Sequence, residues 1–460
     1  MKRSLFPLML VVLSACGDSS DGAGAPKTED TPTEPENTFA DLVAIDQIAV
    51  YQGVKVTLAD ERQIIETKKI NAPVIPQRPA LVRVHAKGLQ PRTKVRATAE
   101  LHIHVKGKPD AVFTDKAKTL VSLDDATMSS TFNFDVPPEA IDTGATLDVA
   151  VHDETSPDQV VTFPEDGSAL PMNVGPLAPT LRVKFVPVKY DADGSGRTPD
   201  MSASAIENYK NALYRWYPTS NVEVNVRDTL RWPMQVDPNG DGWDKLLNAV
   251  MTTRTDDLAP DDMYYIAVFD PTDDVSEWCA EGGCVLGIAP QALLRDVSMR
   301  VAMITGYPDN EGTLAQELGH AMGRAHAPCG GAQYVDPDYP YARANIGVFG
   351  WDIVDKQLVD PDDRVYDFMS YCHPNWVSDY TFAGLYERMV KVAQTKRVEG
   401  EVSGGAGGAE KDELVQLTHV RPDGTTRPGA RVRARDLDLD GDAMRSIAGK
   451  PGSLRVDRIP

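Results

Sequence analysis

The 460-residue sequence lacks a long apolar run, a basic cluster and a dense set of cysteines. Its apolar stretch at residues 5–13 is too short to remain as a membrane span. Asp and Glu number 68 against 47 Lys and Arg, and the resulting formal charge of −21 would repel a nucleic acid. The chain also has no CxxC pair, no GxSxG motif and no phosphate-cradling glycine loop. These absences argue against a four-cysteine zinc module, a nucleophile-elbow hydrolase and a P-loop protein.

The amino terminus has the pattern of an export signal. Lys2 and Arg3 precede the apolar run, which ends in Leu-Ser-Ala-Cys at residues 13–16. This ending resembles the lipobox of bacterial lipoproteins, and the resemblance implies that Cys16 carries a lipid that anchors the chain to a membrane. We therefore expect an exported bacterial lipoprotein of the cell envelope, at the outer membrane or the cell surface. The alternative is an ordinary signal peptide with an incidental cysteine.

Residues 17–38 are rich in Gly, Ser, Pro, Thr, Asp and Glu and have hardly any apolar side chains. Such a segment cannot offset the entropy of folding, so a flexible tether is predicted. Its root-mean-square reach is on the order of 30 Å, which is enough to hold a domain clear of a membrane.

Four cysteines remain if Cys16 is lipidated, and an even number in an oxidising compartment predicts two disulfides. Three connectivities are possible. We favour Cys279 with Cys284, which flank a Gly-Gly turn, and Cys329 with Cys372, which bracket the candidate site described below. Loop-closure entropy predicts that the short bridge stabilises the fold by roughly 2 kcal/mol and the long one by roughly 4 kcal/mol.

The pattern of secondary structure divides the rest of the chain. Residues 39–180 contain short runs of alternating apolar and polar side chains separated by Pro, Gly and Asp, which is typical of an antiparallel β-sandwich. His102 and His104 would share one face of a strand there, and we interpret them as solvated strand histidines. From residue 181 strands alternate with helices, which indicates an α/β domain. The helices are expected at residues 202–217, 243–253 and 378–394.

The strongest motif lies at residues 316–326, QELGHAMGRAH. On a helix, Gln316 and His320 are one turn apart and can reach the same ion, with Glu317 beside them. Gly323 would let the chain leave the helix and return His326 to that ion. Three protein ligands with an open position are the arrangement of catalytic zinc sites, so Zn²⁺ is the expected cofactor and Glu317 the general base.

This stretch resembles the HExxHxxGxxH signature of the metzincin metallopeptidases, with the first histidine replaced by Gln316. Residues 365–371, VYDFMSY, look like the Met-turn of that family. By this resemblance Met369 lies beneath the metal, and Tyr371 stabilises the oxyanion formed during attack. Residues 282–290 are similar to the family's edge strand, in which Gly287, Ile288 and Ala289 would hold an extended substrate peptide.

The strand patterns and the resemblance, which covers roughly residues 181–400, together predict a multidomain fold, in which an N-terminal antiparallel β-sandwich precedes an α/β metzincin-like catalytic domain and a small β-rich C-terminal appendage. The expected divisions are a signal peptide at residues 1–16, a tether at 17–38, the sandwich at 39–180, the metallopeptidase domain at 181–400, and a Gly-rich linker with a β segment at 401–460.

Two functions remain open at this point. The first is a surface-anchored zinc endopeptidase that hydrolyses extracellular proteins or glycoproteins. The second is a weakened or inactive pseudoprotease that binds such partners, because a neutral amide at Gln316 is a poorer zinc donor than an imidazole. His373 could supply a replacement imidazole, although an exposed loop histidine is the simpler interpretation. We expect a monomer with a protein or glycoprotein substrate and no nucleic-acid partner.

Two acidic segments, residues 237–242 and 436–441, resemble the first half of a calcium loop. Their twelfth positions are Asn248 and Ile447 rather than glutamate, so neither is an EF-hand. We interpret both as turns with solvated carboxylates, with Ca²⁺ as a second candidate ion in one of them.

Overall fold

The structure is a computed structural model of the chain. It describes residues 37–90, 94–280, 283–402, 414–420, 426–433 and 454–458, with side chains as far as residue 395. The predicted signal peptide, Cys16, the tether up to residue 36, the Gly-rich linker and the acidic segment 436–441 lie outside the described residues. No helix in the described part of the chain is both long and apolar enough to cross a membrane.

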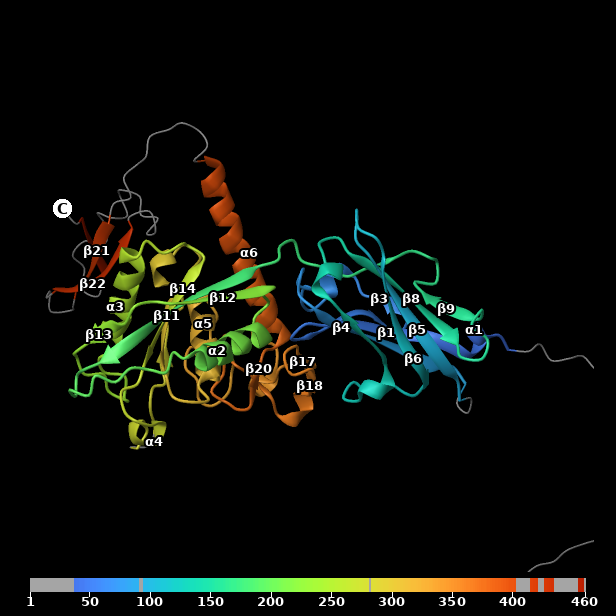
Figure 1. Cartoon of the computed structure of the whole chain (residues 1–460), viewed down its shortest axis with the longest axis horizontal. Helices are drawn as coiled ribbons and strands as arrows, with labels where there is room; N and C mark the ends of the chain where they lie inside the picture. Colours follow the sequence, from blue (N-terminus) through green and yellow to red (C-terminus); the bar gives the residue numbers. More distant parts are fainter. Residues whose placement is uncertain are drawn as a thin grey trace, which may run out of the picture.

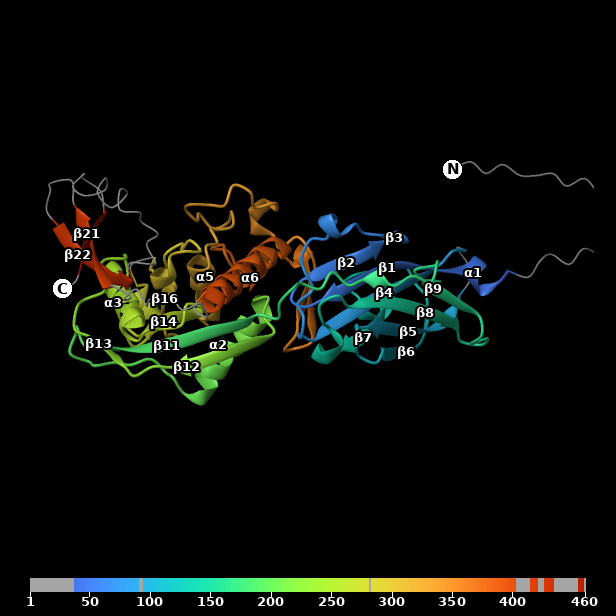
Figure 2. The same cartoon turned by 90° about the horizontal axis from the view of Figure 1, so that it is seen from above.

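β-Strands make up most of the regular secondary structure of the described chain, several of the sheets are antiparallel, and helices are few (Figure 1). The predicted β-rich, multi-sheet architecture is therefore confirmed. Two bodies lie end to end along the longest axis, with the N-terminal sheets at one end and a mixed sheet with its helices at the other (Figure 2).

The N-terminal β-sandwich consists of two antiparallel sheets that follow a four-residue helix, α1 (Phe39–Leu42). The first sheet has the order β3-β2-β1-β4-β7, and its strands are β1 (Val43–Tyr51), β2 (Lys55–Asp60), β3 (Gln63–Ile64), β4 (Ala80–Gly88) and β7 (Phe132–Val136). The second has the order β10-β8-β5-β6 with β9 beside β8, and its strands are β5 (Arg96–His104), β6 (Ala111–Thr119), β8 (Thr146–Asp153), β9 (Val160–Phe163) and β10 (Leu170–Pro171).

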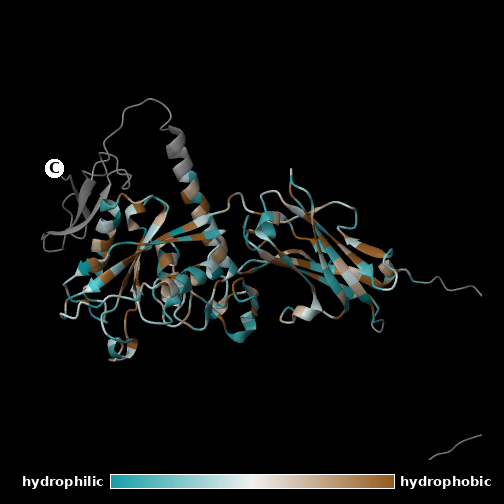
Figure 3. Ribbon diagram, viewed as in Figure 1, coloured by the Kyte–Doolittle hydropathy of each residue, from teal (hydrophilic) through white to brown (hydrophobic). Residues whose placement is uncertain are grey.

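Alternation of apolar residues explains why these strands form a sandwich. In β5 every second side chain is buried, from Ala97 to Ile103, while the intervening residues are partly exposed. A strand with this period buries one face against the other sheet and leaves the opposite face in solvent. The hydropathy colouring shows the same alternation of apolar and polar residues along the strands (Figure 3).

The second body is built on a mixed sheet of order β12-β11-β14-β16-β15, with β13 also paired to β11. Only β15 is antiparallel, and it lies at the edge. The strands are β11 (Thr180–Tyr190), β12 (Asn221–Val226), β13 (Leu230–Trp232), β14 (Met263–Phe269), β15 (Gly287–Ile288) and β16 (Val301–Thr305).

Helices cover both faces of this sheet. Residues on one face, such as Phe185 and Ile266, belong to the same core as α2 (Ala203–Trp216), α5 (Glu311–Ala321) and α6 (Asp379–Val402). Residues on the other face, such as Ala267 and Met303, pack with α3 (Trp243–Asp256). Burial on both faces explains why β14 and β16 read as continuous apolar runs.

Short elements complete the described chain. They are α4 (Val275–Trp278), the pairs β17 (Gly350–Asp352) with β18 (Gln357–Val359) and β19 (Tyr366–Asp367) with β20 (Asn375–Trp376), and a C-terminal sheet of β21 (Leu414–Val420), β22 (Thr426–Arg433) and β23 (Leu454–Arg458). The C-terminal sheet agrees with the predicted β-rich appendage. One apolar core runs from the sandwich into the α2, α5 and α6 side of the mixed sheet.

Candidate metal site

Helix α5 carries three of the predicted site residues. It follows β16 after a short connection, in which the side chain of Asn310 donates a hydrogen bond to the carbonyl of Thr305 (2.6 Å). The helix is fixed in the core by its buried apolar side chains, which are Leu314, Ala315, Leu318 and Ala321. Gln316 and His320 are four residues apart and therefore lie on one face of the helix.

Gly323 ends this helical segment and redirects the chain, as its position in the motif predicts. Its φ of +89° lies in the left-handed region that glycine adopts without strain. The amide of Arg324 then donates to the carbonyl of Gly319 (2.9 Å), which closes the helix end. The following residues bring His326 back beside His320, at a distance of 4.5 Å between ring centroids.

The two imidazole rings face each other with their unprotonated Nε2 atoms. Nδ1 of His320 lies 2.8 Å from the carbonyl oxygen of Arg324, and Nδ1 of His326 lies 2.5 Å from that of Gln333. A carbonyl only accepts, so in the neutral rings each Nδ1 carries the proton and each Nε2 keeps its lone pair. The Nε2 atoms are 3.0 Å apart. Burial lowers the pKa of His320 to about 4, so that ring is neutral at pH 7.

Gln316 adds a third lone pair. In the orientation of its amide that satisfies the two carbonyls of the Met-turn, Nε2 donates to the carbonyls of Phe368 (3.3 Å) and Ser370 (3.2 Å). The opposite amide orientation would place an oxygen against those two acceptors. The other end of the amide lies 3.4 Å from Nε2 of His326, so this position is occupied by the amide oxygen.

Three acceptor atoms therefore converge: the Gln316 oxygen and Nε2 of His320 and His326. Lone pairs facing one another without a donor repel, and a cation among them removes that repulsion. Two imidazole nitrogens suit zinc, and an amide oxygen is a weaker donor. The residues present thus fit a divalent cation. No group of three His, Cys, Asp or Glu side chains is placed to hold a metal ion in the described ranges, which is consistent with glutamine at the third position.

Glu317 lies buried next to this group, with a relative exposure of 6%. Burial alone raises the pKa of its carboxyl to about 8, because no charged partner stabilises the carboxylate. The edge strand passes directly over it: a Cβ on Gly287 would lie 2.6 Å from Cγ of Glu317. Only glycine lets β15 approach the helix so closely. Gly287 and Ile288 form the edge strand that the sequence predicts, and Ala289 follows it.

The predicted Met-turn packs against the same helix. A Cβ on Gly319 would lie 2.4 Å from Sδ of Met369. The thioether therefore packs directly on the backbone of α5 at Gly319, between the positions of Gln316 and His320. Asp367 is fully buried and holds the turn: one carboxylate oxygen accepts from the amide of Met369 (2.8 Å) and the other from that of Ser378 (2.9 Å).

Tyr371 lies beside the third candidate ligand. Its ring centroid is 4.9 Å from that of His326, in an edge-to-face arrangement, and the side chain is about half exposed (49%). Partial burial raises the pKa of its hydroxyl, which therefore stays protonated and able to donate at pH 7. The disulfide between Cys329 and Cys372 ties the chain after His326 to the residue after Tyr371.

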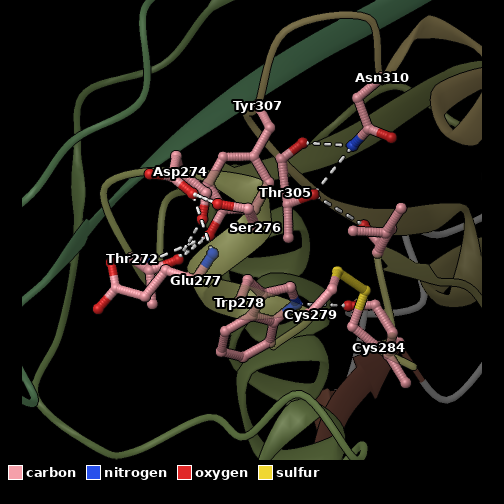
Figure 4. Close-up of a disulfide and its surroundings, with 12 residues drawn as sticks. Thr272, Asp274, Ser276, Glu277, Trp278, Cys279, Cys284, Thr305, Tyr307 and Asn310 are labelled. Carbon is pink, nitrogen blue, oxygen red and sulfur yellow. Dashed lines mark hydrogen bonds between the residues drawn. A yellow bond between two sulfur atoms is a disulfide. The ribbon is translucent and has the colours of Figure 1, made fainter. Parts of the chain in front are cut away.

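The second disulfide supports the edge strand. Cys279 and Cys284 are bonded, as the sequence predicts, and both preferred pairings are thus confirmed. Next to this bridge the indole of Trp278 donates to the carbonyl of Val285 (2.9 Å), two residues before β15 (Figure 4). The bridge and the indole together fix the chain where it enters the strand.

One set of contacts at the site is not predicted by any pattern in the sequence. The guanidinium of Arg324 lies over the ring of Tyr380 (4.7 Å to the centroid) and 3.5 Å from the carboxylate of Asp336. Asp336 in turn donates its backbone amide to the carbonyl of His326 (2.8 Å). Arg324 and Asp336 therefore fix the chain on both sides of this histidine.

The other histidines of interest have different surroundings. His373 is exposed in the loop after the Met-turn. His102 and His104 are only partly exposed, and both bond to Asp148, at 2.9 and 2.6 Å. The interpretation of these two as simply solvated is therefore incomplete, because β8 lies antiparallel beside β5 and brings the aspartate between them.

The acidic segment at residues 237–242 forms a tight turn. The amide of Asp237 donates to the carbonyl of Asp241 (2.9 Å), and the amide of Asp241 donates to the side chain of Asn239 (3.0 Å). The turn immediately precedes α3, and calcium binding there stays a prediction.

No known protein family matches the chain, and a search of curated proteins finds no significant match. The geometry described above is therefore the basis for assigning a function.

Proposed function

We propose that the chain is a zinc-dependent endopeptidase of the metzincin type. The observation that carries this proposal is the convergence of three lone pairs, from Gln316, His320 and His326, beside the buried carboxyl of Glu317. Hydrolytic zinc sites combine such a set of three ligands with an adjacent general base. The resemblance of residues 316–326 and 365–371 to the metzincin motifs supports the same function.

In this proposal Gln316, His320 and His326 hold the ion. Zinc, when bound, supplies a Lewis acid that activates water and polarises the scissile carbonyl. Glu317 takes the proton from the attacking water and gives it to the leaving amine. Burial raises the pKa of Glu317 to about 8 in the metal-free protein, and a bound cation beside it would favour the carboxylate and lower this pKa towards neutral pH, where proton transfer in both directions is efficient.

Two further groups would act on the substrate. The hydroxyl of Tyr371, beside His326, would donate a hydrogen bond to the oxyanion that forms on the attacked carbonyl. The antiparallel strand β15 is the last strand of its sheet and pairs only with β16 within the described residues, so its other edge would pair with an extended peptide through backbone hydrogen bonds. Backbone pairing is independent of the peptide's side chains, so the proposed substrates are extended segments of proteins or glycoproteins.

The proposed place of action is the cell envelope. The lipid anchor at Cys16 would hold the chain at a membrane, and the tether that follows would give it reach. Two disulfides agree with an oxidising, extracytoplasmic environment.

A binding protein without catalysis is the alternative, and the observation that favours it is Gln316 itself. A neutral amide oxygen contributes less to zinc affinity than an imidazole. If zinc is lost at physiological concentrations, the free edge of β15 would still bind extended peptides without cutting them.

The test measures zinc content and cleavage of casein by the purified mature protein, with Glu317→Gln as the matched control because it keeps all three ligands. We expect about one zinc per chain, cleavage by the wild type and none by the variant. A zinc-free, inert wild type whose Gln316→His variant binds zinc and cuts would overturn the enzyme hypothesis and favour the binding protein. If neither form binds zinc, the proposed metal site is wrong.

A further inference from the structure

A tight turn between β1 and β2 of the N-terminal β-sandwich contacts the chain that follows the Met-turn. The carbonyl of Gly53 in this turn accepts a hydrogen bond from the indole of Trp376 (2.7 Å) and another from the backbone amide of Trp351 (3.2 Å). Gly53 has a φ of +116°, and a Cβ there would lie 3.1 Å from the ring of Phe382 and 3.3 Å from the carbonyl of Arg215. The turn therefore fits closely between the two bodies.

The sandwich holds this turn rigidly. Gln52 is buried, and its side chain accepts a hydrogen bond from the amide of Ile75 (2.6 Å). The same side chain donates to the carbonyls of Ile75 (3.0 Å) and Arg78 (2.7 Å). All of these contacts lie within the sandwich, so the position of Gly53 follows the sandwich as a whole.

A buried arginine fixes the sandwich to the second body. Arg78 is fully buried, and its guanidinium donates to the carbonyls of Tyr214 (2.7 Å), Tyr217 (3.0 Å) and Thr219 (2.6 Å) at the end of α2. Burial lowers the pKa of Arg78 to about 10, and it remains charged at pH 7. The C-terminus of a helix is a favourable place for a cation. Separating the two bodies would leave these buried groups without their partners.

From Trp376 the contacts continue to the candidate metal site. The carbonyl of Trp376 accepts from the amide of Phe368 (2.8 Å), and the carbonyls of Phe368 and Ser370 accept from the amide of Gln316. The indole has little freedom to move, because a Cβ on Gly350 would lie 2.3 Å from its Nε1. A short series of hydrogen bonds thus connects Gly53 of the sandwich to the orientation of Gln316.

We infer that Trp376 is a positioning residue through which the sandwich fixes the Met-turn carbonyls and, with them, the amide of Gln316. The sandwich is then part of the metal site's framework rather than an independent module. The expected effect of Trp376 on zinc binding rests on the proposed function. The expected effect of Trp376 on the Met-turn can be measured without metal.

The test compares Trp376→Phe with Trp351→Phe in the full mature chain. Both variants replace a buried indole beside the sandwich, but Trp351 packs against Ala49, Tyr51 and Leu81 and retains its backbone bond to Gly53. Hydrogen exchange is followed over residues 366–376 in the metal-free protein, and the dissociation constant for zinc is measured by competition with a chelator.

We expect Trp376→Phe to accelerate hydrogen exchange over residues 366–376. It should also weaken zinc binding about tenfold, which is the lower end of the range typical for loss of a residue that supports a metal ligand. Trp351→Phe should change neither, even if both variants lower the melting temperature. Unchanged exchange in Trp376→Phe, or equal effects in both variants, would overturn the inference. Faster exchange with unaltered zinc affinity would overturn its link to Gln316. A wild type that binds no zinc would reject the proposed function, while the exchange measurement would still decide the role of Trp376.

Discussion

Met369 and Gly319 are in direct contact: a Cβ on the glycine would lie 2.4 Å from the methionine sulfur. Because Gly319 immediately precedes His320 on α5, this contact sets how deeply the Met-turn sits beneath the candidate ligands. The same turn presents the carbonyls of Phe368 and Ser370 to Gln316. The spacing between helix and turn therefore affects both the packing and the ligand geometry.

Gly319→Ala should disrupt this contact. The added methyl group must push Met369 away, and overpacking of this kind costs about 1–3 kcal/mol of the free energy of unfolding. Zinc affinity should fall as well, because the Met-turn carbonyls move with the methionine. Urea denaturation of the metal-free protein and zinc titration measure the two effects.

Gly312→Ala on the same helix is the matched control. A Cβ at Gly312 has no atom within 4 Å, so the substitution should be neutral or stabilise the protein by up to about 1 kcal/mol through helix propensity. A Gly319→Ala protein as stable as the Gly312→Ala protein, with wild-type zinc affinity, would contradict the proposed role of the contact.

Local patterns in the sequence account for the elements around the site. The helix expected at residues 202–217 is α2 (Ala203–Trp216), and Ser202 caps it by accepting from the amide of Ala205. Helix period, cap and the glycine at Gly323 are all encoded by neighbouring residues. The predictions for them succeed because the forces involved act within one or two turns.

The contacts that orient the site are not encoded locally. Gly53 and Trp376 are separated by 323 positions in the chain, and no pattern around either residue predicts the bond between them. The amide of Gln316 is oriented by two backbone carbonyls, which every residue type possesses. The motif also does not predict the roles of Arg324 and Asp336, because those roles depend on how the loop after His326 folds.

The pKa of Glu317 predicts how stability depends on pH in the metal-free protein. Burial raises this pKa from 4.5 to about 8, so between these values the folded state binds more protons than the unfolded state, and stability falls as pH rises. Glu317→Gln removes the ionisation and should be more stable at pH 8, by at most roughly 4 kcal/mol.

The measurement for Glu317 is the difference in the free energy of unfolding between wild type and Glu317→Gln at pH 5 and pH 8. Other carboxyl groups titrate equally in both proteins and cancel in the difference. If the difference in the free energy of unfolding is the same at both pH values, burial does not raise the pKa of the Glu317 carboxyl.

The two disulfides should contribute unequally. Cys329 and Cys372 close a loop with a separation of 43 residues, and Cys279 and Cys284 one of 5. Double substitution by alanine should therefore cost about 4 kcal/mol for the first bridge and about 2 kcal/mol for the second. Denaturation curves of both double variants test this order.

The functional effects of the two double variants should also differ. Loss of the Cys329–Cys372 bridge frees the chain between His326 and Tyr371 and should weaken zinc binding. Loss of the Cys279–Cys284 bridge loosens the entry to β15 and should raise KM with zinc retained. If both variants lose zinc to the same degree, the separate roles assigned to the bridges are wrong.

Gln316→Glu is the most informative substitution at the site itself. A carboxylate is intrinsically a better zinc donor than an amide, and on this ground alone the variant should bind zinc more tightly. However, the carboxylate has no N–H to donate to the carbonyls of Phe368 and Ser370 and would face both with a lone pair. Leaving buried acceptors without a donor costs about 1–3 kcal/mol, more when a charge is involved.

We therefore expect Gln316→Glu to bind zinc more weakly than the wild type, by about tenfold or more, since 1.4 kcal/mol corresponds to a factor of ten. Gln316→His should bind more tightly, because an imidazole is the donor that zinc prefers. Chelator competition at constant pH ranks the three proteins. A Gln316→Glu protein that binds zinc more tightly than the wild type would mean that the Met-turn carbonyls do not orient residue 316. Any lower affinity of the wild type than of Gln316→His would then follow from the neutral amide alone.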